Sequence, residues 1–343
     1  MNSPTSASRS RRTLLGACSL LLAAGTLTAC GQSADSDADA AGGAAPKADA
    51  GAFPATVHTK FGDAEIPKTP RRVVALGWSD QDALLALGVK PVAIVKTEDS
   101  FAHGVGPWAQ KALGGARPQV LNTTDGYPIE KIAALRPDLI VGVQSGLTAA
   151  DYTKLKQIAP TVAYPAGREA YGTPWEEQTK LIGKAVGRGK EAERAVANVK
   201  AGLKKDAETY PQLKGKTFLY TFPQAANGRV VLYKDDRTKV LEQVGLKLDP
   251  LVGKAAKMNT FANSLSMEHL DELTSDALIV WFNTPKDRQQ LESNAVFKKL
   301  PSVRSGAYAP VDRTLSQASS APSVLSIPWA MDKLLPKLAK SLG

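Results

Sequence analysis

The chain contains one short sequence pattern twice, at an offset of 138 residues. Each copy has apolar residues three positions apart, as on one face of a short helix, followed by an unbroken apolar run. At this offset Glu130 aligns with Glu268, and Asp138 aligns with Asp276. An unbroken apolar run is typical of a strand covered on both faces, as in a parallel sheet with flanking helices. The repeat therefore predicts an α/β fold with two similar lobes and a cleft between them.

A single long helix is expected between the two copies. Residues 190–210 carry an apolar stripe at helical spacing, and Pro211 ends the pattern. The 343 residues are enough for two ordinary domains. We therefore expect an N-terminal lobe over residues 53–187, a connecting helix over 188–212 and a C-terminal lobe over 213–343. In the second lobe the sequence predicts a helix over about 287–300, a strand over 308–311 and a terminal helix over about 322–342.

Residues 1–29 have the pattern of an export signal peptide. Three arginines, at positions 9, 11 and 12, precede an apolar run over 14–28. This run is too short to cross a bilayer comfortably, because a spanning helix needs about 20 residues. Its end, Leu27-Thr28-Ala29-Cys30, resembles the site where bacterial lipoproteins are cut before a lipid-modified cysteine. We expect Cys30 to be the lipidated N-terminus, and the paired arginines leave both the twin-arginine and the general secretory route open.

Cleavage before Cys30 changes the composition of the mature chain. It removes three arginines and Cys18, which lowers the formal net charge from +10 to +7 and leaves one cysteine. The mature chain then has no internal disulfide and no cysteine metal site. Residues 30–52 are rich in Gly, Ala, Ser and Asp, which predicts a lipid-anchored flexible tether. An exported protein without a cluster of aromatic and basic residues is not expected to bind nucleic acid.

Several segments occur in an order that resembles a known family. They are Arg72-Val73-Val74-Ala75-Leu76, the Glu130 copy of the repeat, the long helix and the Glu268 copy. Together they resemble the class III substrate-binding proteins of ABC importers. Two further segments are similar to those of the iron-siderophore-binding lipoproteins of Gram-positive bacteria, actinobacteria in particular: Tyr171-Gly172-Thr173-Pro174-Trp175 and Tyr233-Lys234-Asp235-Asp236-Arg237. The resemblance covers about residues 55–340 and depends on the order of many weak motifs.

This resemblance implies a fold and a set of partners. The fold would be α/β, with two Rossmann-like lobes joined by one rigid helix, and with the ligand held in the cleft. The protein would be a monomer, anchored by lipid to the outer face of the cell membrane, that delivers a ferric siderophore to an ABC permease. In the family one glutamate of each lobe meets an arginine of the permease, and the matching residues here are Glu130 and Glu268. A carboxylate near a helix start also suits the helix dipole, so each glutamate has a second, purely structural interpretation.

The ligand-binding residues are expected where strands end, because ligands of open α/β sheets sit outside the carboxyl ends of the strands. Arginine offers fixed donors to the oxygens of an iron complex, and aromatic rings can cover its organic part. A single tryptophan could equally belong to the core, and a single arginine could be a solvated surface charge. The cleft is predicted because several such residues occur together at expected strand ends. By position the candidates are Trp78, Arg168, Tyr171, Trp281 and Arg313, and the resemblance adds Tyr233 and Arg237.

Other functions have weaker support in the sequence. No catalytic motif is recognisable, so we do not expect an enzyme. His58, His103 and His269 are scattered, which argues against a bare metal site and against a permanent metal cofactor. Haem, with Tyr171 or His103 as ligand, or cobalamin are the alternative ligands to a siderophore of the hydroxamate, catecholate or citrate type. A sensor or adhesion lipoprotein on the same fold stays open, although the matched glutamates favour import.

Overall fold

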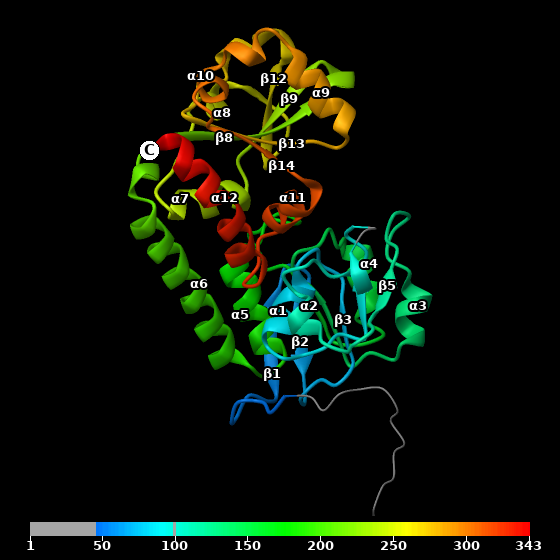
Figure 1. Cartoon of the computed structure of the whole chain (residues 1–343). Coiled ribbons are helices and arrows are strands. Elements are labelled where there is room, and N and C mark those ends of the chain that lie inside the picture. Colours follow the sequence, from blue (N-terminus) through cyan, green and yellow to red (C-terminus); the bar gives the residue numbers. More distant parts are fainter. Residues whose placement is uncertain (1–45, 99–100) are drawn as a thin grey trace, which may run out of the picture. The chain divides into compact units, whose positions relative to one another are not determined.

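Two β-sheets, each with helices around it, organise the chain (Figure 1). The computed structural model describes residues 46–98 and 101–343. The expected signal peptide over 1–29, Cys30 and most of the expected tether lie outside the described residues. No helix in the described part of the chain is long and apolar enough to cross a membrane.

The sheet of the N-terminal lobe has five parallel strands in the order β5-β4-β3-β6-β7. All residues of β3, β4, β6 and β7 are buried, as expected for a parallel sheet covered on both faces. An antiparallel hairpin, which the sequence analysis did not predict, precedes this sheet. The strands are β1 (Ala55–Thr59), β2 (Gly62–Ile66), β3 (Val73–Ala75), β4 (Ala93–Val95), β5 (Gln119–Leu121), β6 (Leu139–Gly142) and β7 (Thr161–Ala163). The helices are α1 (Asp80–Ala86), η1 (Ala102–Gly104), α2 (Gln110–Leu113), α3 (Ile129–Ala134), α4 (Ala149–Leu155) and α5 (Trp175–Ala185).

The sheet of the C-terminal lobe is mixed. Its order is β11-β12-β9-β8-β13-β14, with β10 beside β8. Strands β8, β10, β13 and β14 pair in parallel, whereas β9, β12 and β11 join the sheet through antiparallel pairing with their neighbours. The short turn η3 (Ala225–Asn227) joins β8 to β9, and a link this short requires antiparallel strands. The strands are β8 (Thr217–Gln224), β9 (Arg229–Tyr233), β10 (Lys247–Leu248), β11 (Ala256–Lys257), β12 (Ala262–Ser266), β13 (Ala277–Trp281) and β14 (Tyr308–Val311).

The repeated aspartates make the same contact in both lobes. Asp138, just before β6, accepts hydrogen bonds from the backbone amides of Arg71 and Arg72, both at 2.8 Å. Asp276, just before β13, accepts one from the backbone amide of Thr217 at 2.8 Å. In each lobe the aspartate therefore fixes the start of the parallel neighbour, β3 or β8, against its own strand. The aspartates of the repeat therefore have a structural role in fixing strand register.

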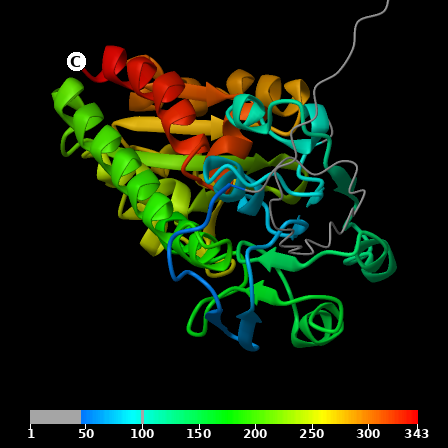
Figure 2. The same cartoon turned by 90° about the horizontal axis from the view of Figure 1, so that it is seen from below.

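The long helix α6 (Gly189–Thr209) runs from one lobe to the other, as Figures 1 and 2 both show. Its stripe is buried by both lobes: Ala192 belongs to the core of the N-terminal lobe, whereas Val196, Val199 and Leu203 belong to that of the C-terminal lobe. The short helix η2 (Pro211–Leu213) follows it. The helices of the second lobe are α7 (Asp236–Gln243), α8 (Leu251–Lys254), η4 (Met267–Glu272), α9 (Pro285–Ser293), η5 (Phe297–Lys299), α10 (Pro301–Arg304), α11 (Arg313–Ser320) and α12 (Ser326–Leu342).

Several boundaries differ from the sequence-based expectations. The terminal helix begins at Ser326 instead of Pro322, and the unexpected helix α11 precedes it. The helix expected over 287–300 is α9 followed by the short 3₁₀ helix η5. The helix ends because the side-chain oxygen of Asn294 accepts hydrogen bonds from the backbone amides of Val296 and Phe297. The helix of the second repeat is the 3₁₀ helix η4. The expected tether ran to residue 52, but Asp49 accepts a hydrogen bond from the Lys190 amide, so its last residues are part of the folded lobe.

The buried carboxylate of Asp82, on helix α1, connects the two lobes. The Oδ2 atom of Asp82 accepts hydrogen bonds from Nε1 of Trp108 and from the hydroxyl of Ser323, which leads into α12, both at 2.7 Å. Its Oδ1 atom has no hydrogen-bond partner among the described residues. Burial raises the pKa of Asp82 to about 6, and the nearby carboxylate of Asp80 adds to this effect. The ionised side chain is therefore tolerated at a cost in stability.

We predict that Asp82→Asn raises the free energy of unfolding at pH 7.5 and has little effect at pH 4. The folded protein binds a proton at Asp82 between about pH 4 and pH 6, where the unfolded chain has lost it. Stability from this group consequently falls as the pH rises through that window. The upper limit of the gain at pH 7.5 is roughly 3 kcal/mol, the value that corresponds to the raised pKa. The amide oxygen of asparagine can still accept both hydrogen bonds.

The measurement is thermal and urea unfolding at both pH values. Asp125→Asn, at an exposed loop position, is the matched control and should show no pH-dependent gain. A variant that is less stable than wild type at pH 7.5 would contradict the prediction.

Candidate functional site

A cavity of about 370 Å³ lies where loops of both lobes meet. Its wall from the first lobe follows the carboxyl ends of the parallel strands β3, β6 and β7, as expected for ligand sites of open α/β sheets. A second cavity, of about 380 Å³, shares Trp78 with the first and extends to Glu98 and Arg313. Both volumes lie in the range of small-molecule sites. We call the two cavities together the cleft.

Trp78 stands on a turn that a buried carboxylate holds in place. Asp80 accepts hydrogen bonds from the backbone amides of Val143 (2.8 Å) and Gln144 (3.0 Å) and from the side-chain amide of Gln178 (2.7 Å). Burial raises the pKa of Asp80, and these hydrogen bonds act in the opposite direction. Gly77 is required here, because a Cβ atom at this position would lie 2.3 Å from an Asp80 oxygen. The β3–α1 turn and the β6–α4 loop are thereby fixed to one another.

Trp78 and Tyr171 form an aromatic wall of the cleft. Their ring centroids are 4.7 Å apart, and Trp78 is 48% exposed although it is a large apolar side chain. Tyr171 adopts a positive φ of 59°, which its backbone hydrogen bonds with Ser145 and with the Gln144 side chain maintain. The ring of Tyr171 lies against Gly146, where an added Cβ would approach it to 2.8 Å. The wall is therefore preformed.

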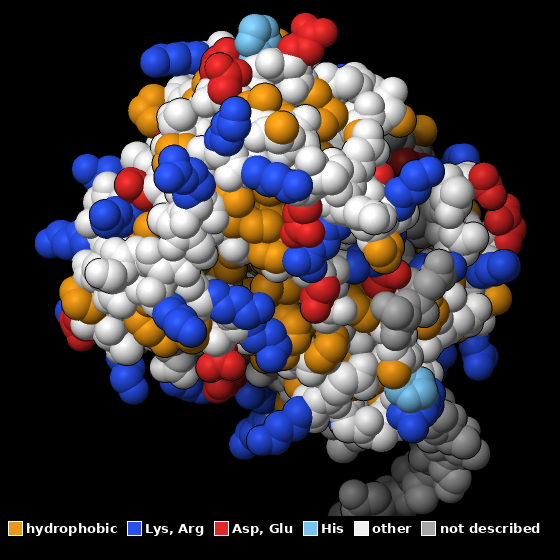
Figure 3. Space-filling model, turned by 45° about the horizontal axis from the view of Figure 1, so that its top comes forward, with side chains coloured by type: hydrophobic (Ala, Val, Ile, Leu, Met, Phe, Trp, Pro, Cys, Tyr) orange, Lys and Arg blue, Asp and Glu red, His pale blue; other side chains and the backbone are white. Residues whose placement is uncertain are grey.

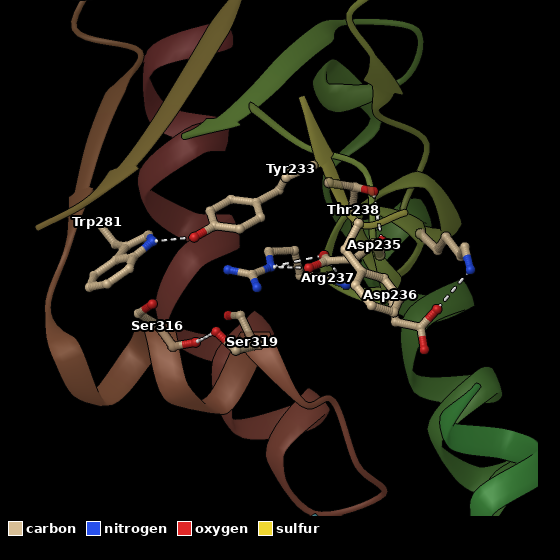
Figure 4. Close-up of polar contacts among 12 residues, drawn as sticks. Tyr233, Asp235, Asp236, Arg237, Thr238, Trp281, Ser316 and Ser319 are labelled. Carbon is tan, nitrogen blue, oxygen red and sulfur yellow. Dashed lines mark hydrogen bonds and ion pairs between the residues drawn. The ribbon is translucent and has the colours of Figure 1, made fainter. Parts of the chain in front are cut away.

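Figure 4 shows the opposite wall, built from the second lobe. The Nε atom of Arg237 donates to both oxygens of Asp235, at 2.8 and 2.9 Å. Its guanidinium lies over the ring of Tyr233, 3.7 Å from the centroid. Nε1 of Trp281 donates to the Tyr233 hydroxyl at 3.2 Å, and the Trp281 ring stacks on Phe222. Arg237 is thus buried and charge-balanced, with its terminal amino groups directed towards Tyr233 and Ser319 (Figure 4).

The structure brings most of the sequence-predicted residues together. Trp78, Arg168, Tyr171, Tyr233 and Arg237 line the first cavity, and Arg313 lines the second. Trp281 lines neither and instead supports Tyr233 from behind. The sequence analysis missed Asp80, Gln144 and Phe261. Asp80 carried a weak signal, because an acidic residue follows Gly77-Trp78-Ser79 after a buried strand, but this pattern also describes an ordinary helix start.

The other two predicted arginines, like Arg237, have carboxylate partners. Arg168 pairs with Glu177, at 2.7 Å between Nη2 and Oε2. Arg313 pairs with Glu98 of the other lobe and also donates to the side-chain oxygen of Asn283 at 3.0 Å. The Glu98–Arg313 ion pair therefore spans the cleft.

Glu130 and Glu268 lie away from the cleft cavities. Both are exposed in the first turn of their helices, α3 and η4. Neither carboxylate forms an ion pair with another of the described residues. Both positions are therefore exposed at the start of a short helix, an α-helix for Glu130 and a 3₁₀ helix for Glu268.

Other parts of the surface are separate from the cleft. His58 pairs with Asp63 at the hairpin, and within residues 46–98 and 101–343 no three His, Cys, Asp or Glu are grouped to hold a metal ion. A groove of about 590 Å³ between α6 and α12 contains none of the predicted site residues. On the face drawn in Figure 3, Lys and Arg are spread among Asp and Glu, and apolar side chains gather in its middle.

Comparison with known proteins identifies the class. The periplasmic binding protein family matches residues 73–309. A periplasmic solute-binding protein of Mycobacterium smegmatis superposes with a TM-score of 0.76 at 35% identity, over 84% of this chain and 99% of that one. The Streptococcus pneumoniae protein PiaA, in complex with ferrichrome, gives a TM-score of 0.72 at 28% identity, over 84% and 98%. The iron(3+)-hydroxamate-binding protein FhuD of Bacillus subtilis is 28% identical over 307 residues, 85% of this chain and 87% of that protein.

The chain belongs to the periplasmic binding protein family. It is a substrate-binding protein and not an enzyme, with two α/β lobes joined by a long helix.

Proposed function

We propose that this protein is the extracellular substrate-binding component of an ABC importer and that it captures a ferric siderophore in the cleft. The main support for this proposal is that aromatic rings and arginines from both lobes line one cleft. Rings can cover the organic backbone of the ligand, and guanidinium groups can donate to oxygens around the iron. The similarity to ferrichrome-bound PiaA and to FhuD supports this choice of ligand.

The proposed contacts divide into two kinds. Trp78, Tyr171 and Tyr233 would pack against the ligand, and Arg168, Arg237 and Arg313 would donate to its oxygens. Trp281 would act indirectly, because its indole holds the Tyr233 hydroxyl in place. The bound iron is cargo, and the protein itself would carry no permanent cofactor.

Ferric siderophores should quench the tryptophan fluorescence of the purified protein, because Trp78 would lie against the iron complex. Trp78→Ala should weaken binding of the same complex at least about tenfold, the usual consequence of removing a central aromatic anchor. Val296→Ala, which shortens an exposed apolar side chain outside the cleft, is the control. Native mass spectrometry reports binding independently of fluorescence. If no ferric siderophore binds, or if haemin alone binds and gives a Soret band, the proposed function is wrong.

Glu130 and Glu268 are proposed as the docking residues for the permease. They are exposed, equivalent in two similar lobes and separate from the cleft. Each carboxylate would accept charge-assisted hydrogen bonds from an arginine of the permease.

The double variant Glu130→Ala, Glu268→Ala should nearly abolish iron uptake by cells while siderophore affinity in vitro stays unchanged. Each single variant should reduce uptake only in part, because an exposed ion pair contributes about 1 kcal/mol or less. The double variant Glu65→Ala, Glu193→Ala removes two exposed carboxylates elsewhere and serves as the control. Normal uptake at normal expression would rule out docking through these glutamates, and lost affinity would assign them to the ligand site.

We also propose that the protein is held at the outer face of the membrane by lipid on Cys30. The support is the Leu27-Thr28-Ala29-Cys30 sequence together with relatives named as lipoproteins, such as the probable siderophore-binding lipoprotein YfiY of Bacillus subtilis. Cys30→Ala should release the protein into the medium or leave its precursor uncut, as measured by cell fractionation and intact mass. A variant that stays with the membrane at the mass of the mature wild-type protein would contradict the anchor.

A further inference from the structure

A groove between α6 and α12 has no part in the functions proposed above. The two helices lie side by side, as Figures 1 and 2 show, and the groove has a volume of about 590 Å³. This volume is larger than that of either cavity of the cleft and lies in the range of small-molecule sites. None of the described residues lines both the groove and the cleft. The buried wall of the groove is apolar and consists of Val199, Leu203, Val324, Ile327 and Met331.

Gly202, in the second half of α6, leaves part of the groove open. A Cβ atom at this position would meet no atom of another element within 4 Å, so packing does not require a glycine here. The backbone does not require one either, because φ of Gly202 is not positive. Glycine inside a helix lowers its stability relative to alanine. The missing side chain is therefore best explained by the space that it leaves in the groove.

The charged side chains that line the groove are all carboxylates, namely Glu191, Asp206 and Asp332. Glu191 is paired with two neighbouring arginines. Asp206 of α6 and Asp332 of α12 form no ion pair with any of the described residues. Burial raises the pKa of Asp206, Lys205 lowers it, and the carboxylate of Asp332 raises it again. The two aspartates are therefore close enough to repel one another, and the polar part of the groove favours a cation.

The groove lies at the junction of the two lobes. Ala86, which lines it, ends helix α1 of the N-terminal lobe, and Leu325 packs against the cores of both lobes. Two residues before Leu325, Ser323 donates its hydrogen bond to Asp82 of the other lobe. A ligand in the groove would therefore contact both lobes and stabilise their arrangement.

We propose that this groove is a second binding site, separate from the cleft, for a small organic cation with an apolar body. The apolar body would cover the buried wall. An ammonium or guanidinium head would lie between Asp206 and Asp332, donate hydrogen bonds to both carboxylates and relieve the repulsion between them. An anion of the same shape would be repelled by the same two groups. The site does not depend on the proposed siderophore function, because it shares no lining residue with the cleft.

The first test is isothermal titration calorimetry of the wild-type protein with octylammonium as the probe. Octylammonium should bind at least about tenfold more tightly than octyl sulfate, which has the same tail and the opposite charge. It should also bind at least about tenfold more tightly than methylammonium, because burial of the tail contributes to binding. The proposal is wrong if octylammonium does not bind, or if octyl sulfate binds equally well.

The second test is Gly202→Leu, which extends an apolar side chain into the groove. It should weaken octylammonium binding at least about tenfold, because the side chain occupies the space of the ligand. Gly202→Ala is the matched control and should bind within about threefold of wild type, because one methyl group leaves most of the groove free. Both variants should be at least as stable as wild type, since alanine and leucine favour a helix. Unchanged affinity in Gly202→Leu would place the cation elsewhere and overturn the proposal.

The third test removes the two carboxylates with the double variant Asp206→Asn, Asp332→Asn. Octylammonium affinity should fall at least about fivefold, and the difference from wild type should diminish at 1 M salt. The double variant Asp125→Asn, Asp271→Asn changes the net charge equally at exposed positions elsewhere and should bind like wild type. Self-association of the protein in sedimentation experiments that Gly202→Leu abolishes would assign the groove to a second copy of the chain and overturn the proposal.

Discussion

The buried carboxylate of Asp80 is the interaction on which the binding face of the first lobe depends. It receives the amides of Val143 and Gln144 and the side chain of Gln178, so it joins the loop after β6, helix α5 and the turn that carries Trp78. Gln144 in turn binds the backbone of Tyr171 and accepts from the amide of Trp78. A buried carboxylate is expensive unless its oxygens are satisfied. Three donors satisfy the oxygens of Asp80 and so offset the cost of its burial. The same hydrogen bonds hold Trp78 and Tyr171 in place before a ligand binds.

The cleft wall of the second lobe is held in place by different interactions. Its wall is a chain of contacts from Phe222 through Trp281 and Tyr233 to Arg237 and Asp235, in which stacking and cation–π contacts replace backbone hydrogen bonds. The guanidinium is held between a ring and a carboxylate, which restricts the side-chain entropy that ligand binding would otherwise cost. The two walls therefore differ in chemistry, and Tyr233 of the second wall ends the antiparallel strand β9 instead of a parallel one.

The sequence was most informative where a contact is local or periodic. The repeat, the apolar strands and the stripe of α6 predicted two α/β lobes and a connecting helix. The strand ends indicated Trp78, which lines both cavities, but also Trp281, which lines neither. The strand-fixing role of Asp138 and Asp276 could not be predicted, because it requires knowing which strands are neighbours. Asp235 lies two residues before Arg237 and could have been paired with it. Glu98 could not have been paired with Arg313, because 215 residues separate them and only the folded lobes bring them together. The strand over residues 229–233 was expected, but its antiparallel direction was not, because an apolar pattern does not reveal direction. The short antiparallel strands β11 and β12 were not predicted at all.

The contacts between the lobes favour binding of a ligand with little movement of one lobe relative to the other. The stripe of α6 is shared, with Ala192 in one core and Val199 and Leu203 in the other, so bending the helix would open packed contacts in both. Such contacts are costly to open, because protein interiors are close-packed. On the α1 side Ser323 binds Asp82 across the lobes, and across the cleft Arg313 binds Glu98. A wide movement of the lobes would therefore break the packing of α6 and both of these contacts. Selectivity must then come mainly from the shape and charge that the cleft already has.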